Sequence, residues 1–301
     1  MKMVGNDPKI KFQLQTIILI LILMTIATSD LQKLNKSYKV LSKNDVTWHW
    51  QKWQGLPYLT CSLLQNWPHG FFTNHFFPNT PTELVEILHL PAEVYRVQQV
   101  HGNTVLVAGK STFEAEANYP EADGLLTEKA KQAVWVCTAD CVPVLIADQK
   151  TGQVAAVHAG WRGTAAKIVP VALAGFEAHG SQLSDLLVVL GPAIAGEVYQ
   201  VSEEVAAQVG MTIFSDTGKA TIQDTLHFLE LLPNSPILSD PEPGKVRLDV
   251  RVVNILQLKQ LGIGNQQVAI APYCTYQQPN YFFSYRREKQ KKVQWSGIVS
   301  S

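Results

Sequence analysis

The sequence contains little cysteine and no excess of either charge. Four cysteines among 301 residues are too few for a disulfide scaffold. Lys and Arg number 25, as do Asp and Glu, so the formal net charge is zero. Proteins that bind nucleic acid through its phosphates are normally basic, so we do not expect nucleic acid as a partner. A hydrophobic content of 46% excludes a disordered chain.

Long hydrophobic runs are also missing, apart from a short one near the N-terminus. The uncharged run Ile17–Ala27 follows several lysines and is shorter than the roughly 20 residues that cross a membrane. Together with the small residues Ala27 and Ser29, it is typical of a signal peptide. Residues 15–29 therefore indicate export or a membrane anchor, unless translation starts downstream and this stretch is never made.

The rest of the chain divides into a linker and one domain. Residues 31–45 are polar, so we assign 1–45 to the N-terminal segment with its linker and 46–301 to a single catalytic domain. Strand-like and helical patterns alternate there, which predicts a mixed α and β fold. The predicted strands are 94–100, 104–107, 133–137, 142–147, 154–158, 186–190 and 267–271. The predicted helices are 164–178, 202–209 and 248–261, the first capped by Thr164 and kinked or delayed by Pro170.

The segment Thr138–Thr164 is the most informative part of the sequence. Two apolar strands flank the turn residues DQKTGQ, which predicts a hairpin. A turn centred on Lys150 and Thr151 places Pro143 opposite His158. Cys141 then lies on the same face as His158 and diagonal to it, about 7–8 Å away at Cα. A thiolate and an imidazole in this relation could share one metal ion, provided that the turn length is right.

A catalytic zinc site needs a third ligand, and His101 in QQVHGN is the best candidate. Three protein ligands leave a fourth position for water. The spacing does not require this choice, because 40 residues separate His101 from Cys141. A Cys–His pair is also the minimum for a thiolate nucleophile with its base. The remaining histidines are interpreted as surface or packing residues: His49, His69, His75, His89, His179 and His227.

Six segments together resemble the YfiH family. They are QVHG (99–102), ADGLLT (122–127), TADCVPVL (138–145), VAAVHAGWRG (154–163), LGPAI (190–194) and CTY…FFSYRR (274–287), in order between residues 68 and 289. These are the laccase-domain proteins once described as multicopper polyphenol oxidases. The resemblance implies an α/β/β/α layered fold akin to the cysteine hydrolases of the necrotizing-factor group. It also implies that His101, Cys141 and His158 are zinc ligands.

The resemblance further implies a reaction and its substrates. The family's purine nucleoside activity is phosphorolysis of adenosine, inosine and 5′-methylthioadenosine, with deamination of adenosine alongside. Some members oxidise phenols with copper. This chain departs from the family at PHGFFTNHFF, where Asn74 replaces an expected Arg and the following loop is shorter. A substrate contact is therefore either missing or supplied from elsewhere.

These reactions suggest roles for residues near the metal ligands. Asp140 is a candidate proton shuttle, or else a turn carboxylate. Arg162 between two glycines could bind phosphate or stay solvated. Arg286 and Arg287 follow an aromatic strand, so only one of them could reach inward beside Ser284. Trp161 or Phe283 could stack on a purine, or both are core residues. The three cysteines outside the site are interpreted as buried thiols, which favours the cytoplasm: Cys61, Cys137 and Cys274.

Several hypotheses therefore stand side by side. The first is a zinc enzyme that acts on purine nucleosides and phosphate. The second is an amidase for a cell-wall peptide precursor, with Cys141 as nucleophile and His158 as base. The third is a membrane-tethered binding module with a structural zinc ion, which would need a fourth ligand. A copper-dependent phenol oxidase is weaker, because Met211 lies in an unrelated stretch and supplies no obvious axial ligand. The sequence does not indicate an oligomeric state.

Overall fold

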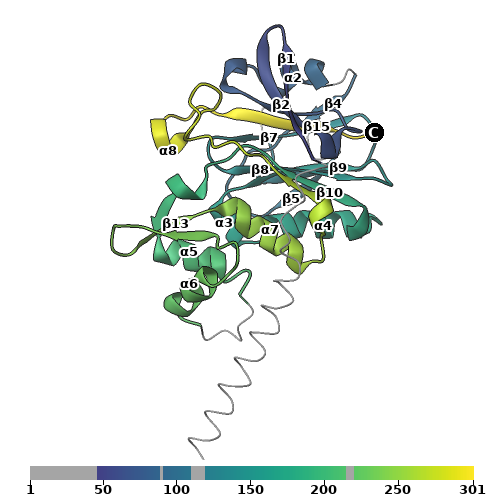
Figure 1. Ribbon diagram of the computed structural model, residues 1–301. Coiled ribbons are helices and arrows are strands. Elements are labelled where there is room, and N and C mark those ends of the chain that lie inside the picture. Colours follow the sequence, from purple (N-terminus) through teal and green to yellow (C-terminus); the bar gives the residue numbers. More distant parts are fainter. Residues whose placement is uncertain (1–45, 89–90, 110–118, 215–219) are drawn as a thin grey trace, which may run out of the picture. The chain divides into compact units, whose positions relative to one another are not determined.

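Two six-stranded sheets face each other and form the centre of the fold (Figure 1). The computed structural model describes residues 46–88, 91–109, 119–214 and 220–301. The N-terminal segment and linker predicted at 1–45 lie outside these residues. Within the described residues, no helix is long and apolar enough to cross a membrane.

The first sheet contains both early and late parts of the chain. Its strand order is β1 (Trp48–Trp53), β2 (Leu56–Cys61), β3 (His69–Phe72), β15 (Gln294–Val299), β7 (Gln132–Thr138) and β4 (Glu93–Tyr95). The second sheet follows the order β14 (Val268–Ile270), β10 (Leu186–Leu190), β8 (Val142–Asp148), β9 (Val154–Ala159), β6 (Gly124–Thr127) and β5 (Val105–Ala108). A small third sheet is built from β11 (Gln200–Ser202), β13 (Lys245–Leu248) and β12 (Ile237–Ser239).

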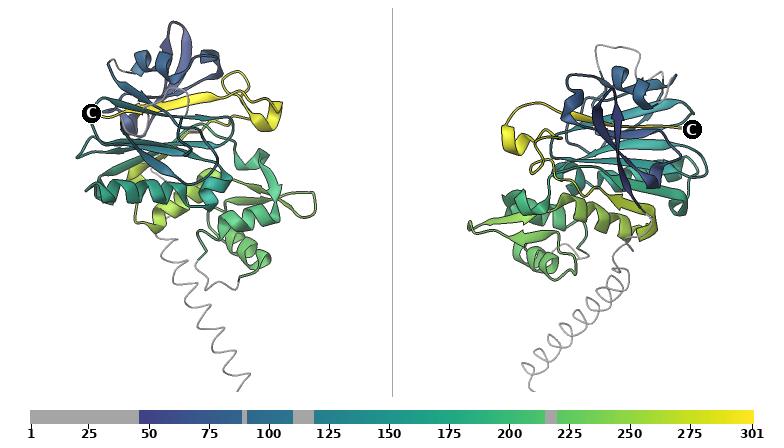
Figure 2. Two further views of the ribbon diagram at one scale, coloured as in Figure 1. Left: turned by 180° about the vertical axis from the view of Figure 1, so that it is seen from behind. Right: turned by 45° about the horizontal axis from the view of Figure 1, so that its top comes forward.

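Helices complete the layers. The α-helices are α2 (Pro81–Leu88), α3 (Trp161–Ala165), α4 (Ile168–Ala178), α5 (Glu203–Gly210), α6 (Ile222–Glu230), α7 (Val250–Gln260) and α8 (Tyr285–Glu288). The short 3₁₀ turns are η1 (Ser62–Leu64), η2 (Asn74–Phe76), η4 (Leu183–Asp185), η5 (Gly196–Val198) and η6 (Asn265–Gln267). Helix α2 covers the outer face of the first sheet, and α3, α4 and α7 cover the outer face of the second (Figures 1 and 2). The expected α/β/β/α layering is therefore present.

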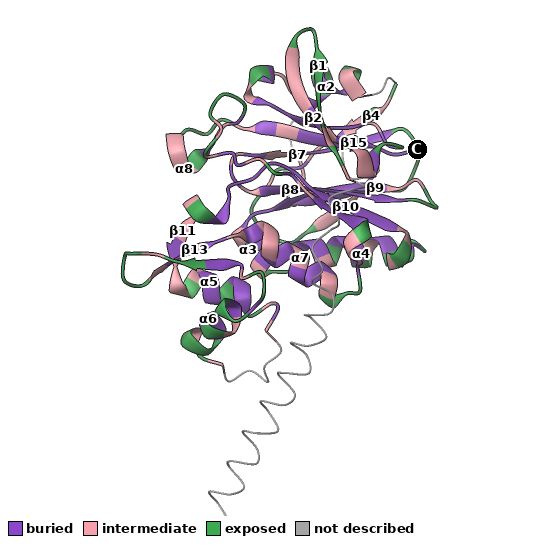
Figure 3. Cartoon of the chain, in the orientation of Figure 1, coloured by how far each residue is buried: buried purple, intermediate pink, exposed green. Residues whose placement is uncertain are grey.

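The main core lies between the two sheets. Phe71 and Val136 from the first sheet pack against Leu145, Ala156 and Val189 from the second. Because helices cover its other face, the second sheet is apolar on both sides. Every residue of β8 and β9 is buried (Figure 3). This explains why these strands read as continuous apolar runs rather than as alternating ones.

Six of the predicted strands form within about one residue of their expected bounds, as β5, β7, β8, β9, β10 and β14. The strand expected at 94–100 is wrong beyond Tyr95, because β4 ends there and only an isolated bridge at Gln98 follows. The helix predicted at 164–178 forms instead as two helices, α3 and α4. Lys167 takes a left-handed φ of 58°, and α4 starts at Ile168 with Pro170 in its first turn, where the missing N–H costs little.

Two local details differ from the sequence expectation. Thr164 lies inside α3 and not at its start; its hydroxyl accepts a hydrogen bond from Asn254 Nδ2 at 3.0 Å. The aromatic strand expected before Arg286 does not form. Instead, Ser284 accepts a hydrogen bond from the Arg287 amide and caps α8. In contrast, the helix predicted at 202–209 forms as α5, and the Ser202 hydroxyl before it accepts a hydrogen bond from the Val205 amide.

Candidate metal centre

The β8–β9 hairpin places Cys141 and His158 at the same end of two buried strands. Pro143 pairs with His158 and Val142 pairs with Ala159, which is the register predicted from the turn. The Asp148 amide donates to the Gln153 carbonyl at 2.9 Å, closing the other end. Cys141 therefore immediately precedes β8 beside the position where β9 leaves the sheet.

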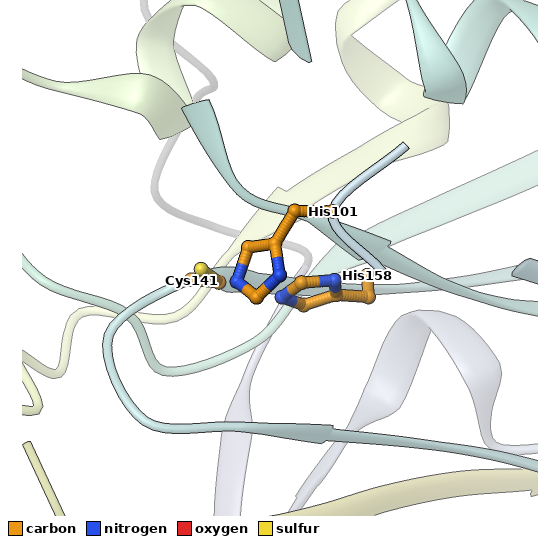
Figure 4. Close-up of side chains that lie close together, drawn as sticks. All are labelled: His101, Cys141 and His158. Atoms are coloured by element: carbon orange, nitrogen blue, oxygen red, sulfur yellow. The ribbon is translucent and has the colours of Figure 1, made fainter. Parts of the chain in front are cut away.

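The structure brings His101, Cys141 and His158 together (Figure 4). One ligand atom from each residue lies within 4.8 Å of the others. The two imidazole rings are nearly perpendicular, at 86°, with centroids 4.7 Å apart. Two imidazoles and a thiol at such separations form a donor set that can hold a divalent metal ion.

His101 comes from a loop that side chains hold in place. Its backbone is left-handed, with φ at 61°. The amides of Val100, His101 and Gly102 all donate to the carboxylate of Asp123, at 3.2, 2.9 and 2.6 Å. Just before them, the side chain of Gln99 accepts from the Cys137 amide and donates to its carbonyl, both at 2.8 Å. These contacts replace strand pairing and explain why the predicted strand stops early.

His158 is oriented by the same carboxylate. Its Nδ1 donates to Asp123 Oδ1 at 2.8 Å, so Nε2 is the nitrogen left for a ligand. Asp123 is fully buried. Sequence reasoning placed it within the ADGLLT block but gave it no role, because an Asp-Gly pair is typical of any turn.

The ionisation of Cys141 and the protonation of His158 favour each other. Burial opposes ionisation of Cys141, but the positive charge of His158 and hydrogen bonds from both imidazoles outweigh it and lower the thiol pKa to about 6. Burial likewise opposes protonation of His158, but the Cys141 thiolate and Asp123 raise its pKa. The metal-free site therefore favours a thiolate beside an imidazolium.

Two glycines permit the close approach of these segments. A Cβ at Gly160 would lie 2.9 Å from the sulfur of Cys141, and one at Gly163 would lie 2.9 Å from the carbonyl oxygen of Gly102. Both distances are shorter than side-chain carbons tolerate. The glycines on either side of Trp161 and Arg162 therefore have a packing explanation apart from any role in binding an anion.

Asp140 lies next to Cys141 in a strained turn, with φ at 102°. Its carboxylate accepts hydrogen bonds from the Thr275 hydroxyl and the Arg286 amide, both at 2.7 Å. Its carbonyl accepts from the Ile194 amide at 2.9 Å. Asp140 thus links the turn to Thr275 and to the start of α8, and its role as a proton shuttle stays a prediction.

The other predicted contact residues differ in their surroundings. Arg286 donates to the Gln200 carbonyl at 2.8 Å and lies 4.8 Å from the centre of the Tyr199 ring. Arg162 is exposed and lies over Trp161, 4.4 Å from the ring centre. Ser284 is buried, and its hydroxyl is engaged as the cap of α8.

Tyr199 is a neighbour of the site that no sequence signal indicated. Burial and the nearby Cys141 thiolate raise the pKa of its phenol to about 12, while Arg286 acts in the opposite direction. The phenol is therefore neutral, and the Arg286 guanidinium lies over its ring. Arg287, by comparison, is turned away from any such role: it donates to the carbonyls of Thr275, Tyr276 and Phe282.

The remaining sequence expectations concern residues outside the group. Asn74, where the family has Arg, donates to the Pro279 carbonyl at 2.9 Å. Cys61 and Cys274 are buried and Cys137 is half-buried, and all are free thiols. Phe283 packs on Phe77, with ring centres 5.5 Å apart.

Comparison with known proteins identifies the family of this chain. Residues 79–299 match the family described as multi-copper polyphenol oxidoreductase laccase. The chain therefore belongs to this laccase-domain family, as the sequence motifs implied.

The names of individual relatives are more specific than the description of the family. A purine nucleoside phosphorylase of Synechocystis sp., slr1573, is 49% identical over 263 residues, which is 86% of this chain and all of the relative. A purine nucleoside phosphorylase of Geobacillus stearothermophilus, YlmD, is 32% identical and covers 70% of this chain and 73% of its own length.

Solved structures agree with the fold. The crystal structure of the Geobacillus YlmD has a TM-score of 0.68 and 26% identity, covering 83% of this chain and 98% of its own. YfiH of Bacillus licheniformis has a TM-score of 0.65 at 23% identity, covering 81% of this chain and 96% of its own. The likeness to cysteine hydrolases stays a prediction.

Proposed function

We propose that this chain is a zinc-dependent purine nucleoside phosphorylase. The observation that carries the proposal is the convergence of His101, Cys141 and His158, from a loop and a hairpin, on one point. The names of the relatives in Synechocystis and Geobacillus support the reaction class. The proposed substrates are adenosine, inosine and 5′-methylthioadenosine with inorganic phosphate, as the family resemblance implies.

The donor set fits zinc. Zinc binds imidazole nitrogen and thiolate sulfur, and catalytic zinc takes three protein ligands with one open position. Among the described residues, no fourth His, Cys, Asp or Glu belongs to the group, which favours a catalytic over a closed structural site. When bound, zinc would supply a Lewis acid at that open position. The axial ligand that copper would need has no support at Met211, whose sulfur accepts a hydrogen bond from the Thr225 hydroxyl.

Phosphorolysis exchanges one bond for another at C1′ of the ribose. The C1′–N9 bond to the purine breaks, a C1′–O bond to phosphate forms, and the departing base takes a proton. Phosphate carries negative charge, so we assign it to Arg286, whose guanidinium lies over the Tyr199 ring, assisted by Arg162, which lies over Trp161. Asp140 positions the start of α8, and thus Arg286, relative to Cys141.

Deamination of adenosine would be a second reaction at the same centre. It requires water to attack C6 of the purine and ammonia to leave. The same three ligands and the same purine would serve, so the proposal includes it as a separate activity. Ammonia release from adenosine in phosphate-free buffer measures it without interference from phosphorolysis.

The proposal is tested by hypoxanthine release from inosine. Zinc-loaded protein is assayed with and without phosphate, beside Cys141→Ala and the matched variant Cys137→Ser, which alters a thiol outside the group. We expect phosphate-dependent release that Cys141→Ala abolishes and Cys137→Ser retains. No release by wild-type protein that carries one zinc ion per chain would overturn the proposal.

A thiol amidase is the second candidate, favoured by a specific observation. Cys141, His158 and Asp123 are arranged as a nucleophile, a base and a carboxylate that orients it, with the Nδ1–Oδ1 distance at 2.8 Å. The lowered pKa of Cys141 fits a nucleophile. Metal-free protein that hydrolyses a peptide amide and loses this activity on alkylation of Cys141 would select the amidase. Stoichiometric zinc with phosphorolysis would select the first proposal.

For the chain as a whole, we propose that residues 46–301 are the catalytic domain and that 1–45 is a separate N-terminal segment. The free thiols of Cys61, Cys137 and Cys274 support a reducing compartment, the cytoplasm. Intact mass and metal analysis of protein from its native source tests both points, since the mass locates the N-terminus and the analysis counts the zinc. A mature protein that begins after residue 29 would support export instead.

A further inference from the structure

The carboxylate of Asp123 bonds both the loop that carries His101 and the ring of His158. Its Oδ1 accepts from the His101 amide and from His158 Nδ1, at 2.9 and 2.8 Å. Its Oδ2 accepts from the amides of Val100 and Gly102, at 3.2 and 2.6 Å. We propose that Asp123 is the positioning residue of the metal centre, which fixes His101 and His158 together before a metal ion binds. This inference rests on the proposed metal site and extends it.

The position of Asp123 in the fold makes this double contact possible. It directly precedes β6, the neighbour of β9, and its carbonyl accepts the His158 amide at 2.7 Å. The backbone of Asp123 therefore fixes His158 along the strand, and its side chain fixes the ring. The three consecutive amides that surround the carboxylate form an anion-binding concavity, which holds His101 in its left-handed conformation.

A neutral amide cannot replace this carboxylate. Each oxygen faces two N–H donors, so either orientation of an Asn side chain would turn its NH₂ group toward two donors. Asp123→Asn keeps the shape but loses the bonds of one oxygen. Replacing Oδ1 removes the bonds to the His101 amide and the His158 ring, and replacing Oδ2 removes those to the Val100 and Gly102 amides on either side of His101. Partners that orient metal ligands in this way typically contribute about 10- to 100-fold in metal affinity.

The chain offers a matched control at the other end of the same hairpin. Asp148 is also fully buried, and its Oδ1 accepts from the amides of Lys150 and Thr151 at 2.7 and 3.1 Å. It contacts no member of the metal group. Asp148→Asn therefore removes a buried carboxylate of the same kind without altering either imidazole.

The experiment measures metal binding directly. Zn²⁺ dissociation constants, from competition with a chromophoric chelator, and Co²⁺ absorption spectra are compared for wild type, Asp123→Asn and Asp148→Asn. We expect Asp123→Asn to bind Zn²⁺ about 10- to 100-fold more weakly with an altered Co²⁺ spectrum, and Asp148→Asn to match wild type. Equal affinities in all three proteins would overturn the positioning role.

A second measurement needs no variant and therefore does not depend on whether Asp123→Asn folds. In zinc-loaded wild-type protein labelled with ¹⁵N-histidine, the proposal requires the His158 proton on Nδ1 and the metal on Nε2. A His158 that carries its proton on Nε2 would contradict it. Failure of phosphorolysis leaves both results unaffected, so the positioning role and the proposed function are tested separately.

Discussion

At each end of the β8–β9 hairpin a buried carboxylate accepts backbone amides, but the two carboxylates hold different kinds of segment. At one end the buried carboxylate of Asp123 holds the loop of His101; at the other, that of Asp148 holds the tight turn at Lys150 and Thr151. Both carboxylates are fully buried and accept backbone amides. Only Asp123 also accepts an imidazole N–H. Burial and capping thus do not distinguish a functional carboxylate from a structural one, whereas the identity of its donors does.

The largest effect is expected from removing His158 at the metal end. His158→Ala deletes a ligand and leaves Asp123 without one of its donors. Phosphorolysis should fall by more than about 100-fold, the upper effect of merely disturbing a ligand's support. The free energy of unfolding should fall by about 1–3 kcal/mol, the cost of an unsatisfied buried group.

Rate assays and urea unfolding measure these two losses. His179→Gln is the control, because His179 is exposed and its ring bonds the Gly175 carbonyl within α4. Unchanged phosphorolysis in His158→Ala would remove the distinction between the two ends of the hairpin.

The next effect concerns the cation assigned to phosphate. Arg286→Gln removes the guanidinium that lies over Tyr199. A hydrogen bond to a charged group contributes about 1.5–3 kcal/mol, so the KM for phosphate should rise roughly 10- to 100-fold while the KM for inosine changes little. Lys289→Gln alters an exposed cation just after the same helix and should leave both constants unchanged. A change confined to the KM for inosine would move the phosphate site elsewhere.

A smaller effect is expected from crowding the metal end by one methyl group. Gly163→Ala would place a carbon 2.9 Å from the Gly102 carbonyl oxygen, so the His101 loop must shift. We expect about tenfold weaker zinc binding, the low end for a disturbed ligand support. Gly175→Ala meets Leu126 at an ordinary 3.5 Å and should stabilise α4 by about 0.5–1 kcal/mol with unchanged zinc affinity. Zinc titration and thermal unfolding of both variants separate the outcomes.

The smallest effect is expected at the turn end. Burial raises the pKa of Asp148, but the Ser181 side chain and the turn amides of Lys150 and Thr151 outweigh it and hold the pKa below its usual value. The ionised form therefore stabilises the folded state above about pH 4, and this contribution is lost as pH falls through the lowered pKa. Asp148→Asn should cost about 1 kcal/mol at pH 7, and this difference from wild type should shrink below about pH 4. Urea unfolding at several pH values measures it; a difference that grows in acid would contradict the assignment.

The hairpin could be predicted from the sequence because its information is local. The turn residues around Lys150 and the continuous apolar strands fix one register, and Pro143 pairs with His158 as expected. Other elements depended on distant contacts. The strand at 94–100 stops because the Gln99 side chain pairs with the Cys137 backbone and the Val100 amide donates to Asp123. The aromatic strand before Arg286 is replaced by a cap at Ser284.

The residues of the candidate site also differ in how far the sequence alone predicts them. Register alone brought Cys141 toward His158. His101 was only the best candidate from its setting in QQVHGN until the family resemblance implied it, because spacing does not require it and a loop of left-handed backbone has no periodic pattern. Asp123 and Tyr199 carried no recognisable signal. Their importance arises from what lies against them in space, and a single sequence does not contain that information.

The position of β15 in the first sheet has a consequence for how the protein is made. This strand, Gln294–Val299, lies between β3 and β7 and pairs with both. During synthesis, therefore, the edges of β3 and β7 that pair with β15 remain unpaired until β15 emerges from the ribosome. The sandwich closes only then, so a nascent chain halted a few residues early would expose pairing edges that favour aggregation.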